Sequence, residues 1–127
     1  MKSRETVIRL KRFQADEKRR QVAQIESMIA EFERMATDLD REIGIEQERA
    51  GINDPAHFAY PTYAKAAIQR RDNLARSAGE LKTQLADART AFDEALEELK
   101  KVEALDERDH GREHSSHAGA GPERVRA

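Results

Sequence analysis

The sequence predicts an all-α protein in which two long helices form an antiparallel coiled-coil hairpin. Apolar residues recur at alternating steps of three and four along two stretches, the spacing that keeps one side of a helix facing a partner helix. The short segment between the stretches contains two prolines and three aromatic residues, Phe58, Tyr60 and Tyr63. The first series is Val22, Ile25, Ile29, Phe32, Ala36, Leu39 and Ile43; the second is Ala64, Ala67, Arg71, Leu74, Ala78, Leu81, Leu85, Ala88, Phe92, Ala95, Leu99 and Val102.

Composition supports this fold and excludes several functional classes. The 127 residues fit one domain, and 38% charged with 5% aromatic residues is typical of a coiled coil. A net charge of −2 gives no general attraction to nucleic acid or anionic membranes. The chain has no cysteine, and no apolar run approaches the roughly 20 residues that cross a bilayer. The N-terminal residues alternate apolar and charged groups, unlike a secretory signal, so we expect a cytoplasmic protein.

The first helix is expected over residues 3–50. Ser3 can cap its start, and Gly51 stands where a helix commonly ends. The early apolar residues Ile8, Leu10, Phe13 and Ala15 do not extend the later series cleanly. We therefore expect either a register shift or looser packing between Phe13 and Val22.

The connection is expected over residues 51–61. Asp54 followed by Pro55 can start a short helical turn that reaches Tyr60, and Pro61 can start the second helix. The second helix is expected over residues 61–108, so the hairpin domain covers 1–109. The last stretch, 110–127, is rich in Gly, Ser and His and lacks periodicity. We expect it to be a disordered tail whose removal leaves folding intact.

Charge supports the antiparallel arrangement. Residues 1–20 contain eight basic and three acidic groups, whereas residues 93–109 contain eight acidic and three basic groups. An antiparallel hairpin places these segments side by side, whereas a parallel dimer would bring like charges together. A fold near residue 55 also places Arg71 near Asp40, and Phe32 near Ala78.

The connection offers the clearest candidate site. His57, Phe58, Tyr60 and Tyr63 form either a small core that closes the hairpin or a docking surface, because rigid amphipathic rings are good interface anchors. Both roles are possible together if Phe58 faces inward while Tyr60 and Tyr63 face outward.

Other charged and histidine residues suggest less. Lys18 and Arg71 take seam positions (positions that face the partner helix), where their stems can pack while their charged ends reach solvent. His110, His114 and His117 have spacing that suits a metal, but nearby supporting ligands are lacking and we expect no metal or other cofactor. The basic N-terminal cluster lacks interleaved aromatics, so no nucleic-acid binding is expected.

Catalytic signatures are missing from the sequence. It contains no Gly-rich phosphate loop, no nucleophile with a plausible base and no paired carboxylates in a pocket. The many carboxylates suit the ion pairs of helix surfaces. We therefore expect neither an enzyme nor a small-molecule substrate.

The residues resemble a known family beyond their heptads. The segments that carry the resemblance are MKSRETVIRLKRFQADEKRRQVAQIESMIAEFERMATDLDREI and AGINDPAHFAYPTYAKAAIQRRDNL. They look like the flagellar export protein FliJ in its alphaproteobacterial form. The resemblance covers residues 1 to about 109, and Asp54 to Leu74 is its most specific part.

The resemblance implies a non-enzymatic part of the flagellar type III export apparatus, at the cytoplasmic side of the inner membrane. In this family a two-helix coiled coil, similar to the stalk of rotary ATPases, sits in the export ATPase ring. It promotes ring assembly, links the ring to the membrane-embedded export gate and escorts export chaperones.

By analogy to that stalk, the helix ends enter the ring and the loop end faces the gate. We expect ring contacts at Arg4, Arg9, Arg12, Glu97 and Glu98, and gate contacts at His57, Phe58, Tyr60 and Tyr63.

Two alternatives stay open. A generic homodimeric coiled-coil scaffold would bury the same heptads between two chains. A hairpin regulator of RNA polymerase would need acidic residues at its tip, where this chain offers Asp54.

Overall fold

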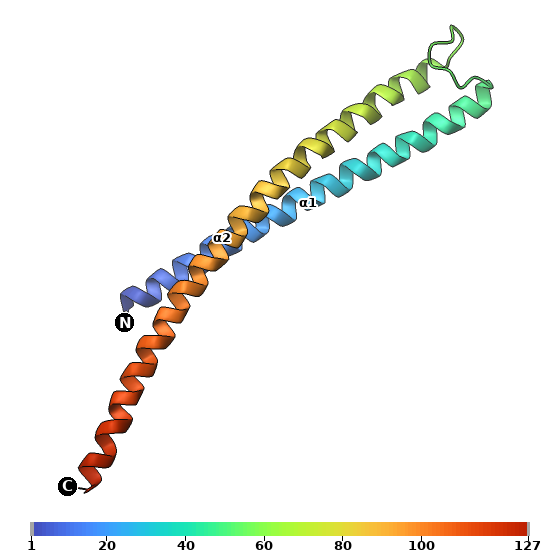
Figure 1. Ribbon diagram of the computed structural model, residues 1–127. Helices are drawn as coiled ribbons and strands as arrows, with labels where there is room; N and C mark the ends of the chain where they lie inside the picture. The colour runs from blue at the N-terminus through green and yellow to red at the C-terminus, as the bar shows by residue number, and fades with distance from the viewer. Residues whose placement is uncertain (1, 127) are drawn as a thin grey trace. The chain divides into compact units, whose positions relative to one another are not determined.

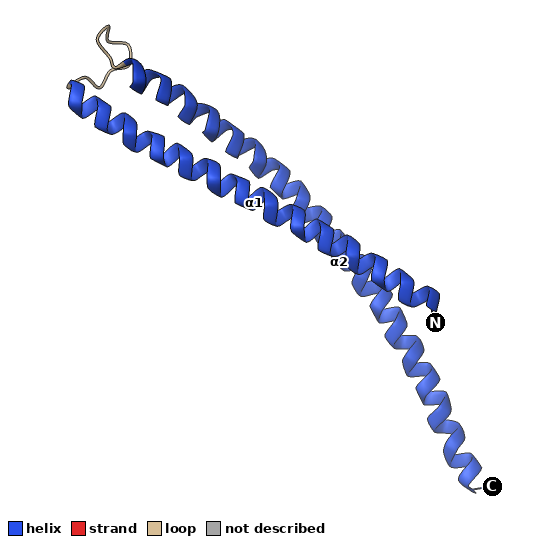
Figure 2. Ribbon diagram, turned by 180° about the vertical axis from the view of Figure 1, so that it is seen from behind, coloured by secondary structure: helices blue, strands red, loops and turns tan. Residues whose placement is uncertain are grey.

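The computed structural model describes the backbone of residues 2–126 and the side chains of residues 3–111. The described chain forms two helices, α1 (Lys2–Ala50) and α2 (Thr62–Arg126), which pack in antiparallel directions (Figures 1 and 2). The predicted all-α hairpin is confirmed. α1 begins one residue before Ser3, so Ser3 lies inside the helix.

Each of two compact units is built from parts of both helices. The terminal unit contains Met1–Arg20 and Arg89–Ala127, and the loop unit contains Gln21–Ala88. The two units differ in how their helices are held together.

Apolar packing holds the loop unit together. Every residue of the two predicted series within this unit is buried or half-buried, Arg71 included. Removing these side chains from water is the main favourable term in folding. Three buried side chains lie at its centre with three half-buried ones around them: Ile29, Leu81 and Leu85, with Val22, Ile25 and Phe32.

Arg71 confirms the predicted level at which the helices pair. Its Nη1 donates a hydrogen bond to Asp40 Oδ1 at 2.9 Å, and its Nε and Nη2 donate to Asp72 Oδ1. These bonds raise the pKa of Arg71 above its ordinary value, because they favour the charged guanidinium. The side chain is 33% exposed, so its stem packs in the seam while its charged end pairs at the edge.

The terminal unit contains charged residues at seam positions. On α1, Ile8 and Ala15 are buried, and Arg4, Lys11 and Lys18 are half-buried. These five positions continue the steps of three and four back from Val22, so the register shift, one of the two predicted alternatives, does not occur. The seam of this unit differs from that of the loop unit because polar side chains occupy some of its positions, while the register continues unbroken.

Both helix ends at the connection follow local chemistry. Gly51 has a φ of +72° and its N–H donates to the Gln47 carbonyl at 2.8 Å, which is the left-handed cap that glycine favours. The prediction for the end of α1 is confirmed. At the start of α2, the Pro61 carbonyl accepts from the Lys65 N–H at 3.1 Å, so Pro61 is the residue just before the helix.

α2 continues as a helix to Arg126, beyond the boundary predicted near Arg108. His110 Nδ1 lies 3.5 Å from Asp106 Oδ2, one helical turn earlier, which shows that the helix crosses that boundary without interruption. Arg4, near the start of α1, pairs with Asp109, so α2 continues past the level at which α1 begins. The side chains of 112–127 lie outside the described residues, and the dispensability of 110–127 for folding stays a prediction.

Replacing two exposed helical glycines by alanine is expected to stabilise the protein. Gly44 and Gly79 lie inside helices, and a Cβ at either position meets no atom within 4 Å. Each change is expected to raise the free energy of unfolding by about 1 kcal/mol, because alanine loses less backbone entropy. Gly51→Ala is the contrasting variant, since its positive φ should cost about 1 kcal/mol. Urea unfolding followed by circular dichroism measures both signs, and stabilisation by Gly51→Ala would contradict the cap.

Candidate functional site

The loop tip (residues 54–60) is ordered by its own hydrogen bonds. Asp54 Oδ1 accepts from the Ala56 N–H at 2.9 Å, and the Asp54 carbonyl accepts from the His57 N–H at 3.0 Å. The His57 carbonyl accepts from the Tyr60 N–H at 3.1 Å, and His57 Nδ1 accepts from the Ala59 N–H at 3.0 Å. The tip therefore consists of two successive turns and not the short helical turn that the sequence predicts.

Two rings project from this frame. Phe58 is 96% exposed, and the His57 ring stacks on it with centroids 4.8 Å apart. The hydrogen bond from the Ala59 N–H holds the imidazole in place under the phenyl ring. Phe58 therefore faces solvent, and the arrangement considered above, with Phe58 inward and both tyrosines outward, does not occur.

Tyr60 takes the inward place. It is 7% exposed, and its hydroxyl accepts a hydrogen bond from Gln47 Nε2 at 2.9 Å. This bond ties the tip to the last turns of α1. Of the two roles left open for these residues, Tyr60 takes that of a small core, because its ring closes the end of the hairpin and its hydroxyl bonds to Gln47 there.

Tyr63 lies between these extremes, at 55% exposed. Its hydroxyl donates to Glu42 Oε2 at 2.5 Å, which braces the first turn of α2 against α1. The bond raises the pKa of the Tyr63 phenol above its ordinary value, because ionisation would lose the bond and oppose two negative charges. Tyr63, Ile45, Glu42 and Glu46 line a shallow groove beside the tip.

Three of the five charged residues predicted to meet a partner are paired within the terminal unit. Arg4 forms an ion pair with Asp109. Arg12 Nη2 lies 3.2 Å from Glu103 Oε2, and Glu98 Oε2 accepts from Lys11 Nζ at 2.7 Å. Arg9 and Glu97 are exposed and form no ion pair within the described side chains, residues 3–111. Of the five predicted ring contacts, Arg9 and Glu97 are therefore the two whose charges remain available to a partner.

Two lysines, Lys11 and Lys18, also lie between the helices of the terminal unit, and the sequence predicted only Lys18 there. Lys18, which the sequence predicts at a seam position, is half-buried and lines a groove with Gln14, Ala91, Glu94, Ala95 and Glu98. Lys11 was missed. Extending the heptad series back from Val22 through Lys18 and Ala15 reaches Lys11, and this signal could have found it.

Acid is expected to weaken the terminal unit through Glu98. The hydrogen bond from Lys11 lowers the pKa of Glu98 below its ordinary value of 4.5. Because this pKa is lower in the folded state, the stability it contributes is present above pH 4.5. That stability is lost as the pH falls through the pKa of the folded state. We expect carboxyl NMR to show a higher pKa for Glu98 in Lys11→Met. An unchanged titration would contradict the pairing.

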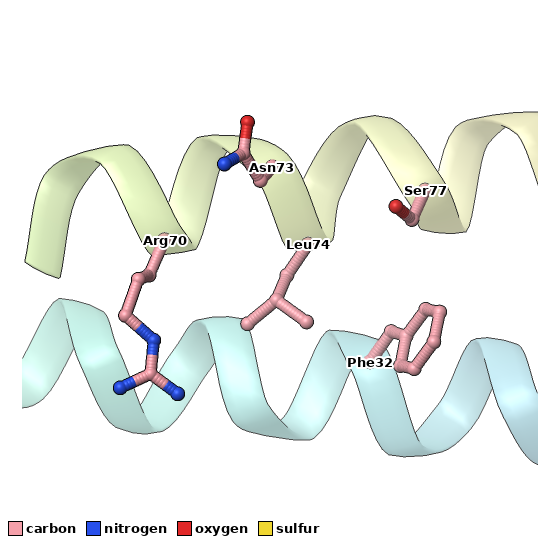
Figure 3. A pocket seen from close by; sticks show the side chains of 5 residues that line it. All are labelled: Phe32, Arg70, Asn73, Leu74 and Ser77. Carbon is pink, nitrogen blue, oxygen red and sulfur yellow. The ribbon is translucent and has the colours of Figure 1, made fainter.

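A shallow groove of about 270 Å³ runs along the loop unit between the helices, lined by Phe32, Arg70, Asn73, Leu74 and Ser77 (Figure 3). Leu74 points toward α1, and the Phe32 ring lies below Ser77, whose small side chain leaves space. Ser77 precedes Ala78, in agreement with the predicted level of Phe32 to within one residue. The lining contains no nucleophile paired with a base.

The described residues contain neither a candidate metal-binding cluster nor a candidate membrane span. Among them, no group of three or more His, Asp or Glu side chains is placed to hold a metal ion, and the side chains of His114 and His117 lie outside the described set. No helix in the described chain is long and apolar enough to cross a membrane.

Comparison with known proteins adds no assignment. No protein-family model, no curated protein and no solved structure matches the chain.

Proposed function

We propose that this protein is a non-enzymatic, FliJ-like stalk of the flagellar type III export apparatus. In this proposal it binds the export ATPase ring, promotes ring assembly, couples the ring to the export gate and meets export chaperones. The observation that carries the proposal is the antiparallel packing of α1 and α2, because a two-helix hairpin is the fold that the sequence resemblance implies.

The two candidate surfaces suit the two partners. In the terminal unit, exposed Arg9 and Glu97 offer polar contacts that can exchange, as a part within a ring requires. At the loop tip, the exposed Phe58 offers a hydrophobic anchor for the gate.

Three contacts count against the alternatives. The carboxylate of Asp54 is engaged by the Ala56 N–H, so it serves as a cap where an RNA polymerase regulator would need an acidic tip. The cross-helix pairs Arg71–Asp40 and Lys82–Glu33 form within one chain. They favour a hairpin over a scaffold whose seam joins two chains, and the mass in solution distinguishes these.

The test is the ATP hydrolysis rate of the matching flagellar export ATPase with and without this protein. We expect stimulation, and we expect Arg9→Glu combined with Glu97→Lys to reduce it without breaking a described ion pair. Arg34→Glu combined with Glu48→Lys is the matched control, because both residues are exposed and lie in the loop unit. If the protein neither stimulates nor co-elutes with the ATPase, the proposal fails and RNA polymerase becomes the next partner to test.

A further inference from the structure

Half of the large apolar side chains that the described chain exposes lie in the terminal unit. They are Val7 (41% exposed), Leu10 (52%), Phe13 (59%) and, on α2, Leu105 (51%). The steps of three from Val7 to Phe13 place these side chains on a row that winds away from the seam. We call Val7, Leu10 and Phe13 the terminal apolar stripe.

Leu105 is exposed on the second helix at a similar level. Arg4 pairs with Asp109 and Arg12 with Glu103, so residues 7–10 of α1 lie level with about residues 104–107 of α2. Val7 and Leu105 therefore occur at the same level of the unit. Large exposed apolar side chains gathered at one level of a molecule are typical of a binding site.

The charges around the stripe indicate which kind of surface is complementary to it. Arg4, Lys11 and Arg12 have acidic partners on α2, whereas Arg9 has none within residues 3–111. Arg9 lies one helical turn before Phe13, on the outer side of α1. A complementary surface is thus apolar and presents a carboxylate opposite Arg9.

An anionic membrane fits these charges less well. Membrane binding by a short amphipathic segment needs a cluster of available basic groups. Here three of the four basic residues between positions 3 and 17 are paired, and Glu5, Asp16 and Glu17 lie among them. The charge pattern therefore favours a protein partner.

We propose that the terminal apolar stripe, with Leu105 and Arg9, is the surface by which the terminal unit docks onto an apolar, acid-bearing protein surface. This inference rests on the proposed function, in which the terminal unit meets the export ATPase. In this inference the main contacts are the apolar side chains of the stripe and not the paired charges Arg4, Arg12 and Glu98. The paired charges hold the two helices together so that the stripe is presented.

The experiment measures binding of the purified export ATPase to the full chain and to Leu10→Ser combined with Phe13→Ser. Both residues are exposed, so the melting temperature should stay unchanged, while loss of two anchors is expected to weaken binding by at least about 30-fold. Ile45→Ser, an exposed apolar residue of the loop unit, is the matched control and should bind normally. Arg9→Glu should weaken binding and reduce its dependence on salt.

The outcomes separate the two proposals. If the unaltered chain binds and the double variant binds equally well, the stripe is not the docking surface, while the proposed function stands. If the unaltered chain does not bind, both fail. The inference would also be overturned if the unaltered chain self-associates or binds anionic lipid vesicles and the double variant does not. Such a result would assign the stripe to a second copy of the chain or to a membrane.

Discussion

Leu81→Ala is expected to lower the free energy of unfolding by about 3 kcal/mol, the largest effect of any single change considered for this protein. Leu81 is 7% exposed and belongs to the apolar cluster with Ile29 and Leu85. The substitution removes buried methyl groups and leaves a cavity between two helices that cannot easily collapse. The change is large beside the 5–15 kcal/mol or so by which small domains are stable.

Met28→Ala is the control for this prediction. Met28 precedes the buried Ile29 but is 43% exposed, so its truncation should change stability by no more than about 0.5 kcal/mol. Urea unfolding followed by the helical circular dichroism signal measures both variants. Equal midpoints for Leu81→Ala and the unaltered protein would show that the cluster does not hold the loop unit together.

Phe58→Ala is expected to weaken binding to the cytoplasmic domain of the export gate protein by about 30-fold while leaving the melting temperature unchanged. Phe58 is 96% exposed, so it contributes little to folding and much area to a partner. The turns at Asp54 and His57 and the stacked imidazole hold the ring in place before binding, which lowers the entropy that binding costs.

Two variants make this prediction specific. Phe58→Tyr keeps the ring and should bind nearly as well as the unaltered protein. Tyr60→Phe removes the hydroxyl that accepts from Gln47, so it should lower stability with the ring of Phe58 still exposed. Normal gate binding by Phe58→Ala would show that the loop tip is not the contact.

Sequence periodicity determined the hairpin itself. Alternating steps of three and four define the buried side of each helix, because 3.5 residues separate successive seam positions on average. Gly51 and Pro61 mark the two helix ends at the connection, since only glycine readily takes a positive φ and proline lacks the N–H of a helix interior. Opposite charges in residues 1–20 and 93–109, and the pair Arg71 and Asp40, indicated the level of the fold.

Only the tertiary structure decided which side chains remain for a partner. The loop tip has no repeat, so the sequence could not show that Tyr60 reaches Gln47 and that Phe58 is exposed. In the terminal unit, pairing of Arg4 and Arg12 depends on the exact level at which α1 meets α2, to within one turn. The physical reason is the same in both places: periodicity records which side of a helix is buried, whereas each exposed contact depends on distances between residues far apart in the chain.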